Sequence, residues 1–265
     1  METLRFHAGL LERPDPSGID VQTSLAHFAI VTYMVDPIVL RRHIHRRFEP
    51  DCILHEGRPR ALVSVVPFMD EDFHFVRCRW PKWNFCQTNY RAYVTDTETG
   101  EHVAWFFGTS LDSVSVYLPR FVWKLPWHRA RINFDCDYDT EQRKYSTYRM
   151  ATTRSWADAH LEICDSGVAP HELAGFTDLE TGLVLLTHPL RGYYFRRDGK
   201  PGSYSVWHER LQTTTANVIS ARFSLLDRLG LVPLADTSSL HSVLVQPKTD
   251  FTIYLPPKSV LSMAK

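Results

Sequence analysis

Three polar side chains at alternating positions stand out in residues 89–95 (NYRAYVT), a segment with strand character. Successive side chains of a β-strand point to opposite faces, so Asn89, Arg91 and Tyr93 share one face. A guanidinium can hold a carboxylate or an enolate through two parallel hydrogen bonds, and the amide and the phenol supply neutral partners. This face is therefore a candidate anion-binding surface. The alternative is a structural ion pair between Arg91 and an acid such as Asp112.

A histidine is the main candidate for proton transfer. His128 lies in the segment LPWHRA, and an imidazole titrates near neutral pH, as a general acid or base requires. The alternative is an ordinary loop histidine that is exposed or hydrogen-bonded. Its neighbour Trp127 is either a wall of a ligand cavity or a core aromatic residue. We expect Lys124, three residues upstream of Trp127, to be solvated rather than to form an imine.

His208 and Glu209 place a second base beside a carboxylate, but adjacent strand residues point to opposite faces. Only one of them can line a cavity, and the sequence leaves open which. Gln212 stands four residues after His208, so the HExxH zinc motif is absent. The chain also has no glycine-rich phosphate loop and no GxSxG nucleophile elbow. We expect no metal and no cofactor.

Composition and charge narrow the class of protein. Of 265 residues, 44% are hydrophobic and 23% charged, and 30 basic residues balance 30 acidic ones, so neither nucleic acid nor a membrane surface is an expected partner. No segment approaches the roughly 20 apolar residues that span a bilayer, and residues 1–16 lack the apolar run of a secretory signal. The five cysteines include no CxxC pair. We expect a soluble, cytoplasmic protein.

The elements that must position these residues are mainly strands. Short segments rich in β-branched and aromatic residues alternate with turn signals such as Asp198-Gly199-Lys200. Short hairpin links can join only antiparallel strands, so an antiparallel sheet is expected. The predicted strands cover residues 61–68, 89–95, 102–107, 144–151, 203–207 and 240–254.

Three helices are predicted. The first begins at Asp36-Pro37 and runs to Phe48, because proline favours the first helical position. The second covers residues 113–123, with Pro119 predicting a kink or an early stop. The third covers residues 214–229, where apolar residues recur at helical spacing and Gly230 follows as a left-handed cap. The prediction is one domain, residues 1–265, of the β-dominated α+β class.

Several short motifs carry a family resemblance. Residues 89–94 (NYRAYV), Trp105-Phe106-Phe107 with Ser110-Leu111-Asp112, and residues 125–130 (LPWHRA) resemble landmarks of the YqjF-like family, also called domain of unknown function 2071. The similarity spans residues 36–256, with Gly108-Thr109 inserted between two of the landmarks. The family is similar to the acetoacetate decarboxylase-like superfamily. The resemblance implies a cone-shaped antiparallel β-barrel around an apolar pocket, with a few peripheral helices.

The resemblance also bears on mechanism. The decarboxylase uses a lysine pair after a Phe-Pro step, and the first lysine forms a Schiff base. Aligned on Leu125-Pro126, that pair falls on Trp127 and His128, neither of which can form an imine. The alignment therefore puts His128 at a pocket position and implies a protein without Schiff-base chemistry. Gln87 replaces a glutamate that is frequent in the family, which weakens proton transfer at that position.

Three functional hypotheses follow. The first is an enzyme of the lyase, isomerase or cyclase type that acts on an apolar oxo-acid, in which Arg91 holds the anion and His128 moves protons. The second is a non-catalytic binding protein that uses the same pocket. The third is an interaction domain whose barrel is filled by side chains. A homo-oligomer is compatible with all three. The predicted ligand-binding residues are Gln87, Asn89, Tyr93, Trp105, Trp127 and Glu209.

Overall fold

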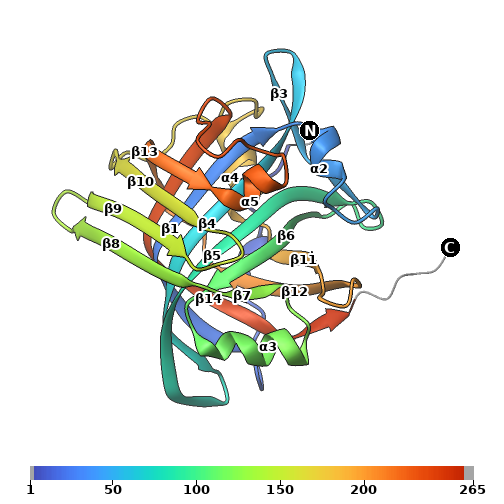
Figure 1. The fold of residues 1–265 in the computed structure, drawn as a ribbon, viewed down its shortest axis with the longest axis vertical. Helices are drawn as coiled ribbons and strands as arrows, with labels where there is room; N and C mark the ends of the chain where they lie inside the picture. The colour runs from blue at the N-terminus through green and yellow to red at the C-terminus, as the bar shows by residue number, and fades with distance from the viewer. Residues whose placement is uncertain (1–2, 260–265) are drawn as a thin grey trace.

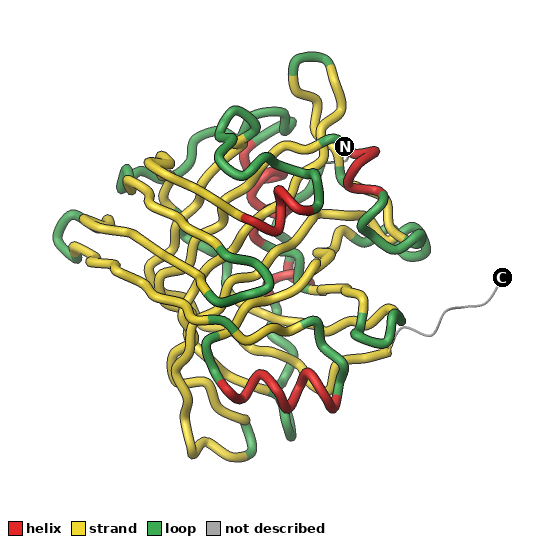
Figure 2. The backbone as a smooth tube through the Cα atoms, viewed as in Figure 1, coloured by secondary structure: helices red, strands yellow, loops and turns green. Residues whose placement is uncertain are grey.

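A computed structural model describes residues 3–259, and one large β-sheet dominates it (Figure 1, Figure 2). Seven strands pair in the closed order β1-β4-β5-β6-β11-β12-β14, and β14 pairs back with β1. The prediction of a β-dominated fold with few helices is therefore confirmed. The ring strands are β1 (Val21–Val35), β4 (Arg58–Phe75), β5 (Cys78–Asp96), β6 (His102–Leu111), β11 (Arg191–Phe195), β12 (Pro201–His208) and β14 (Leu240–Ser259).

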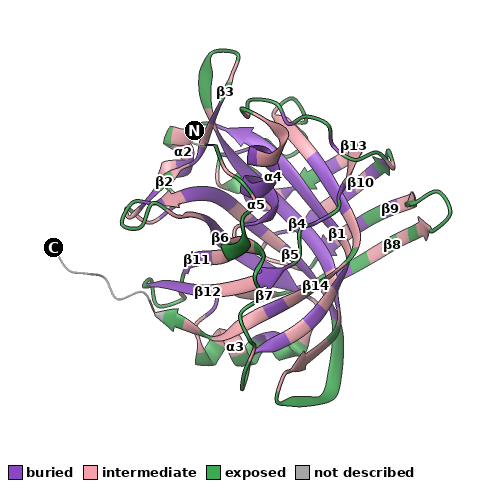
Figure 3. Cartoon of the chain, turned by 180° about the vertical axis from the view of Figure 1, so that it is seen from behind, coloured by how far each residue is buried: buried purple, intermediate pink, exposed green. Residues whose placement is uncertain are grey.

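A second layer covers the outer face of the ring. It continues from β14 through β13 (Thr214–Phe223), β10 (Ala159–Asp165), β9 (Lys144–Thr153) and β8 (Arg131–Asp139). Alternate residues of β1, β4 and β5 point toward this layer and form the main core with it, and Figure 3 shows buried residues along β1 and β4. The other alternate residues point into the ring. The alternation in the sequence thus separates a packed outer core from the interior of the ring.

The sheet is mixed rather than purely antiparallel. β6 pairs in parallel with β11 and with the short strand β7 (Trp127–Arg129). Parallel neighbours require a crossover, and helix α3 (Tyr117–Val122), preceded by the 3₁₀ turn η1 (Val114–Val116), connects β6 to β7. Two further short strands, β2 (Phe48–Pro50) and β3 (Cys52–His55), pair with β5 and β4.

The helices agree only in part with the prediction. α2 (Pro37–Arg41) begins where expected, and Asp36 Oδ1 accepts a hydrogen bond from Ile38 N at 2.7 Å. It ends seven residues before Phe48, which starts β2 and packs on aromatic rings of the ring strands. η1 and α3 match the second prediction, because Pro119 lies in the first turn of α3, where its missing N–H costs nothing. No helix of residues 3–259 has the length and apolar character needed to cross a membrane.

The third helix prediction, residues 214–229, is wrong. Most of that segment is β13, and only α5 (Ser224–Arg228) is helical. A register shift in the β10–β13 pairing leaves Ile219 without a partner. The bulge puts the core-facing residues Val218 and Ala221 three positions apart, which is the spacing of a helix. Gly230 does adopt a left-handed conformation after α5, with φ of 66°.

Gly108 occupies a second bulge, where β6 skips Phe107 in its pairing with β5. A Cβ atom on Gly108 would lie 2.7 Å from the Trp156 ring and 3.0 Å from the Pro126 carbonyl oxygen. We expect Gly108→Ala to reduce the free energy of unfolding by about 1–3 kcal/mol, measured by denaturant titration. The loss should shrink in a Trp156→Ala background, and an equal loss there would contradict this origin.

Candidate functional site

A cavity of about 290 Å³ lies inside the ring. Its walls are mostly apolar and aromatic, with side chains from β1, β4, β5, β6, β12, β14 and α3. Helix α4 (Leu179–Thr187) fills the interior beyond the cavity, where Leu183, Leu185 and Leu186 pack with Phe28 of β1. The polar side chains that line it are few beside the apolar ones. The ionisable and amide groups are Asp70, Gln87, Asn89, Arg91, Tyr204 and His208, and the hydroxyls are Thr23, Thr109, Ser115 and Thr187.

Arg91 lies at the inner end of the cavity. Its Nη2 donates hydrogen bonds to the Leu186 carbonyl oxygen at 2.8 Å and to Tyr93 Oη at 3.3 Å. Its Nε is buried without a hydrogen-bond partner. Within residues 3–259, no carboxylate lies within ion-pair distance of Arg91, and Asp112 accepts a hydrogen bond from Cys86 N instead. The structural ion pair that was the alternative for Arg91 is not formed.

The alternation expected around Arg91 is present. Asn89 and Arg91 line the cavity, whereas Tyr90 and Ala92 belong to the outer core. Asn89 Oδ1 accepts a hydrogen bond from Thr109 Oγ1 at 2.7 Å, which fixes the amide beside Arg91. Tyr93 is fully buried behind the guanidinium, and its hydroxyl contacts Ser64 Oγ and the Leu186 carbonyl oxygen. Tyr93 therefore supports Arg91 from behind and does not line the cavity.

Asp70 is a buried acid that sequence reasoning missed. Thr23 Oγ1 donates to Asp70 Oδ1 at 3.0 Å, and the Gln87 side-chain amide donates to Asp70 Oδ2. Burial raises the pKa of Asp70 to about 7, although both hydrogen bonds oppose that shift. The signal was in the sequence, since Val66, Phe68 and Asp70 share one strand face and only the last of them is charged.

His208 lines the cavity and Glu209 is exposed, which decides between the two adjacent candidates. His208 Nδ1 lies 2.8 Å from the Glu209 carbonyl oxygen, and the ring stacks on Phe251 with 4.4 Å between centroids. Burial and the nearby His188 lower the pKa of His208 to about 3, so its ring is neutral at physiological pH. His208 is therefore a neutral wall of the site.

Two other predicted site residues lie outside the cavity. β7 directs Trp127 into the cavity and His128 to the opposite face, because adjacent strand residues alternate. His128 packs on Trp156 with 4.2 Å between ring centroids, and burial lowers its pKa to about 4. Trp105 is fully buried in the outer core, where it packs on Phe48.

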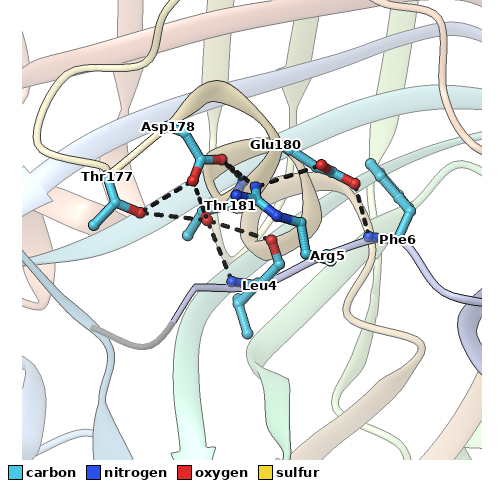
Figure 4. Close-up of polar contacts among 7 residues, drawn as sticks. All are labelled: Leu4, Arg5, Phe6, Thr177, Asp178, Glu180 and Thr181. Carbon is cyan, nitrogen blue, oxygen red and sulfur yellow. Dashed lines mark hydrogen bonds and ion pairs between the residues drawn. The ribbon is translucent and has the colours of Figure 1, made fainter.

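The N-terminal segment holds α4 in place (Figure 4). Arg5 bridges Asp178 at 2.5 Å and Glu180 at 3.4 Å, and the Leu4 and Phe6 backbone amides bond to side chains of the first turn of α4. Asp178 also caps α4, since its Oδ1 accepts from Thr181 N at 2.9 Å. These contacts fix the helix that presents the Leu186 carbonyl oxygen to Arg91.

In residues 3–259, no three or more His, Cys, Asp and Glu side chains gather closely enough to hold a metal ion. The described residues that line the cavity include no lysine. The ionisable groups among them are the Arg91 guanidinium, the Asp70 carboxyl group, the Tyr204 phenol and the His208 imidazole.

Solved structures with a similar fold define the class of protein. Acetoacetate decarboxylase from Legionella pneumophila superposes with a TM-score of 0.57 at 14% identity, covering 96% of this chain and 94% of that chain. The enduracididine biosynthesis enzyme MppR complexed with pyruvate gives 0.59 at 15%, covering 93% and 91%. An acetoacetate decarboxylase-like enzyme from Sphingomonas wittichii RW1 gives 0.59 at 7%, covering 92% and 95%. The fold is acetoacetate decarboxylase-like.

The family follows from the sequence. The model of DUF2071, described as an uncharacterized conserved protein (COG2071), matches residues 22–250. The chain belongs to this family, so the resemblance seen in its motifs is confirmed. No curated protein is a significant match.

Proposed function

We propose that this protein is a small-molecule enzyme that binds an anionic, mostly apolar oxo-acid or related metabolite and acts by positioning and proton transfer. The observation that carries the proposal is Arg91, a guanidinium at the inner end of an apolar cavity with no carboxylate partner in residues 3–259. Buried charges in proteins are normally paired, because an unpaired charge loses its hydration without compensation. A ligand carboxylate supplies the missing partner through charge-assisted hydrogen bonds.

Asp70 supports the proton-transfer part of the proposal. A carboxyl group with a pKa near 7 is populated in both protonation states at neutral pH, which suits a general acid or base. Gln87 and Thr23 orient the carboxyl group toward the cavity that all three line. This assigns proton transfer to Asp70 in place of His128, which lies outside the cavity. Lyase, isomerase and cyclase reactions that move a proton can use such a group.

The solved relatives support an anionic ligand. MppR has been solved with pyruvate bound, and it shares the fold of this chain at 15% identity. Likeness at that level concerns the fold, so the ligand class proposed here depends on Arg91 and the apolar walls around it.

The proposal excludes a Schiff base. The resemblance at Leu125-Pro126 aligns Trp127 and His128 with the lysine pair, and Lys124 is not among the described residues that line the cavity. After incubation with acetoacetate and borohydride, we expect intact mass spectrometry to show unmodified protein. A stable adduct mapped to Lys124 would contradict the proposal, and an authentic decarboxylase treated in parallel serves as the positive control.

A non-catalytic carrier or sensor is the second candidate. Asp70 accepts hydrogen bonds on both of its oxygens, an arrangement that also serves purely to stabilise a fold. Under this alternative, Arg91 would bind the same class of acid and no substitution at Asp70 would alter any turnover. The third hypothesis, a ring filled by side chains, predicted no cavity, whereas the ring encloses about 290 Å³.

Location and partners complete the proposal. All five cysteines are free thiols, which favours a reducing compartment such as the cytoplasm. The partner that we propose is a small molecule and not a nucleic acid, since the chain carries no net charge.

A further inference from the structure

The cavity has a direction along β5. Trp83, Phe85, Gln87, Asn89 and Arg91 are alternate residues of this strand, and all five line the cavity. Trp83 is 38% exposed, whereas Phe85 and Gln87 are buried, so the Trp83 end is open. Arg91 is partly buried and bonds to the Leu186 carbonyl oxygen of the helix that fills the interior, so its end is the inner one. The eight steps from Trp83 to Arg91 span about 26 Å at roughly 3.3 Å per residue.

Polar groups lie at two levels along this length. Arg91 marks the inner end, and the Asp70–Gln87–Thr23 cluster lies four residues closer to the opening, about 13 Å along the strand. Beyond Phe85, the walls toward the opening are apolar or aromatic and include Phe73, Phe75 and Leu255. A molecule that contacts Arg91 and also reaches the opening must therefore be long, and its outer part must be apolar.

The apolar surface continues outside the cavity. Leu118 on α3 lines the cavity and is nevertheless 64% exposed, and Trp80 and Phe121 are exposed beside Trp83 and Leu118 along the chain. We call Trp80, Trp83, Leu118 and Phe121 the apolar rim. Exposed apolar side chains grouped at the opening of a cavity commonly mark a ligand-binding surface. Figure 1 shows α3 at the lower end of the molecule, where the β4–β5 hairpin also ends.

The charges around the rim favour an anion as the entering molecule. Residues 76–85 and 113–124 contain five basic residues and no acidic ones. Such a field steers anions toward the opening. Of these rim cations, Lys82 pairs with Asp72, and Arg120 donates to the Trp127 carbonyl oxygen. Arg91 lies deeper in the cavity, and no carboxylate of residues 3–259 pairs with it. The carboxylate is therefore expected to finish at Arg91 rather than at the rim.

We propose that the ligand is an elongated amphipathic acid whose carboxylate binds Arg91 and whose apolar tail runs past Asp70 to the rim. This inference rests on the proposed function, and it adds the length and the orientation of the ligand. The enclosed volume of about 290 Å³ is at the small end of ligand sites, which span about 300–1,000 Å³. A tail that leaves through the rim fits this small volume, because its end need not be enclosed.

The test is a binding series of saturated straight-chain carboxylates with 4 to 18 carbons, titrated calorimetrically below their micelle concentrations. For wild type, we expect Kd to fall about two- to fourfold per added methylene until the tail reaches the rim, as the transfer of a buried methylene predicts. Leu118→Ser should weaken hexadecanoate and octadecanoate several-fold and leave butanoate unchanged. Leu54→Ser is the matched control, because Leu54 is 68% exposed on β3, at the upper end of Figure 1.

The outcomes separate the two proposals. A Kd independent of chain length, with binding still weakened by Arg91→Met, would overturn the elongated ligand and leave the anion site intact. Equal weakening of short and long acids by Leu118→Ser, or none at all, would show that the tail does not leave through the rim. Wild-type affinity in Arg91→Met, or no binding of any acid by wild type, would overturn the proposed function itself.

Discussion

Replacing Arg91 with Met is expected to weaken the binding of a straight-chain carboxylate by about 100-fold or more while leaving the fold at least as stable. Truncating one partner of a buried charge pair costs about 2–5 kcal/mol of binding. In the free protein the same side chain is partly buried, its Nε has no hydrogen-bond partner, and no carboxylate of residues 3–259 pairs with it, so its removal relieves desolvation. The Leu186 carbonyl oxygen keeps a donor, because Tyr93 Oη also bonds to it at 3.1 Å.

Calorimetric titration and denaturant unfolding together measure this result. If the variant loses binding while its stability equals or exceeds that of wild type, Arg91 is retained for ligand binding and not for the stability of the fold. Arg149→Met is the matched control, since Arg149 is half-exposed on β9 and pairs with Glu162. It should change neither quantity by much. If Arg91→Met destabilises the protein by several kcal/mol and binding is unaffected, Arg91 is a structural residue, and the proposal that it binds the ligand carboxylate is wrong.

Replacing Asp70 with Asn is expected to reduce turnover by about 100- to 10,000-fold while leaving Kd for the acid within a few-fold of wild type. The amide keeps the size of the side chain but cannot act as a general acid or base. Its oxygen can accept from Thr23, and its NH2 group can donate to the Gln87 side chain once that amide turns its oxygen toward it. The wild-type rate should change with pH around 7, and the residual rate of the variant should lose that dependence.

His128→Gln is the control for Asp70→Asn. It removes a titratable group that stacks on Trp156 outside the cavity, so turnover should remain near wild type. A large loss of turnover in His128→Gln with none in Asp70→Asn would return proton transfer to His128 and contradict the assignment made here.

Asp70 also makes stability depend on pH. Its folded-state pKa is about 7 and its unfolded value is about 3.9, so the folded state binds more protons between these values. Stability therefore falls as pH rises from about 4 to about 7, and the full penalty remains above 7. Asp70→Asn should be more stable than wild type at pH 8, by on the order of 2–4 kcal/mol, and the difference should vanish near pH 4. A difference that is constant across this range would contradict the raised pKa.

Local rules predicted much of the fold. Alternation placed Asn89 and Arg91 on the inner face of β5, and the motifs around them indicated the correct family. The same rules failed at bulges. Ile219 shifts the spacing in β13 toward that of a helix, and an insertion at Gly108 is absorbed as a bulge in β6. A bulge is stabilised by contacts with the partner strand, which the sequence of one segment does not contain.

The site was predictable only where one strand determined it. The position of Arg91 could be predicted from the alternation within one strand. The pKa of Asp70 could not, because it depends on burial by several strands that are distant in sequence. Trp105 and His128 were predicted as cavity residues, yet both point to the outer side of the ring, because their register relative to the sheet was unknown. The existence and type of most strands could be inferred from local patterns, but which face lies inward requires the complete ring.

We propose Arg91 as the counter-ion of an acid bound in the ring. A crystal structure of the protein with decanoate tests this role of Arg91 most directly. We expect the carboxylate within about 3 Å of the Arg91 guanidinium, hydrogen-bonded to it, and the alkyl chain running along β5 toward Asp70. Decanoate with its carboxylate at the rim, or a cavity left empty at saturating decanoate, would contradict the claim.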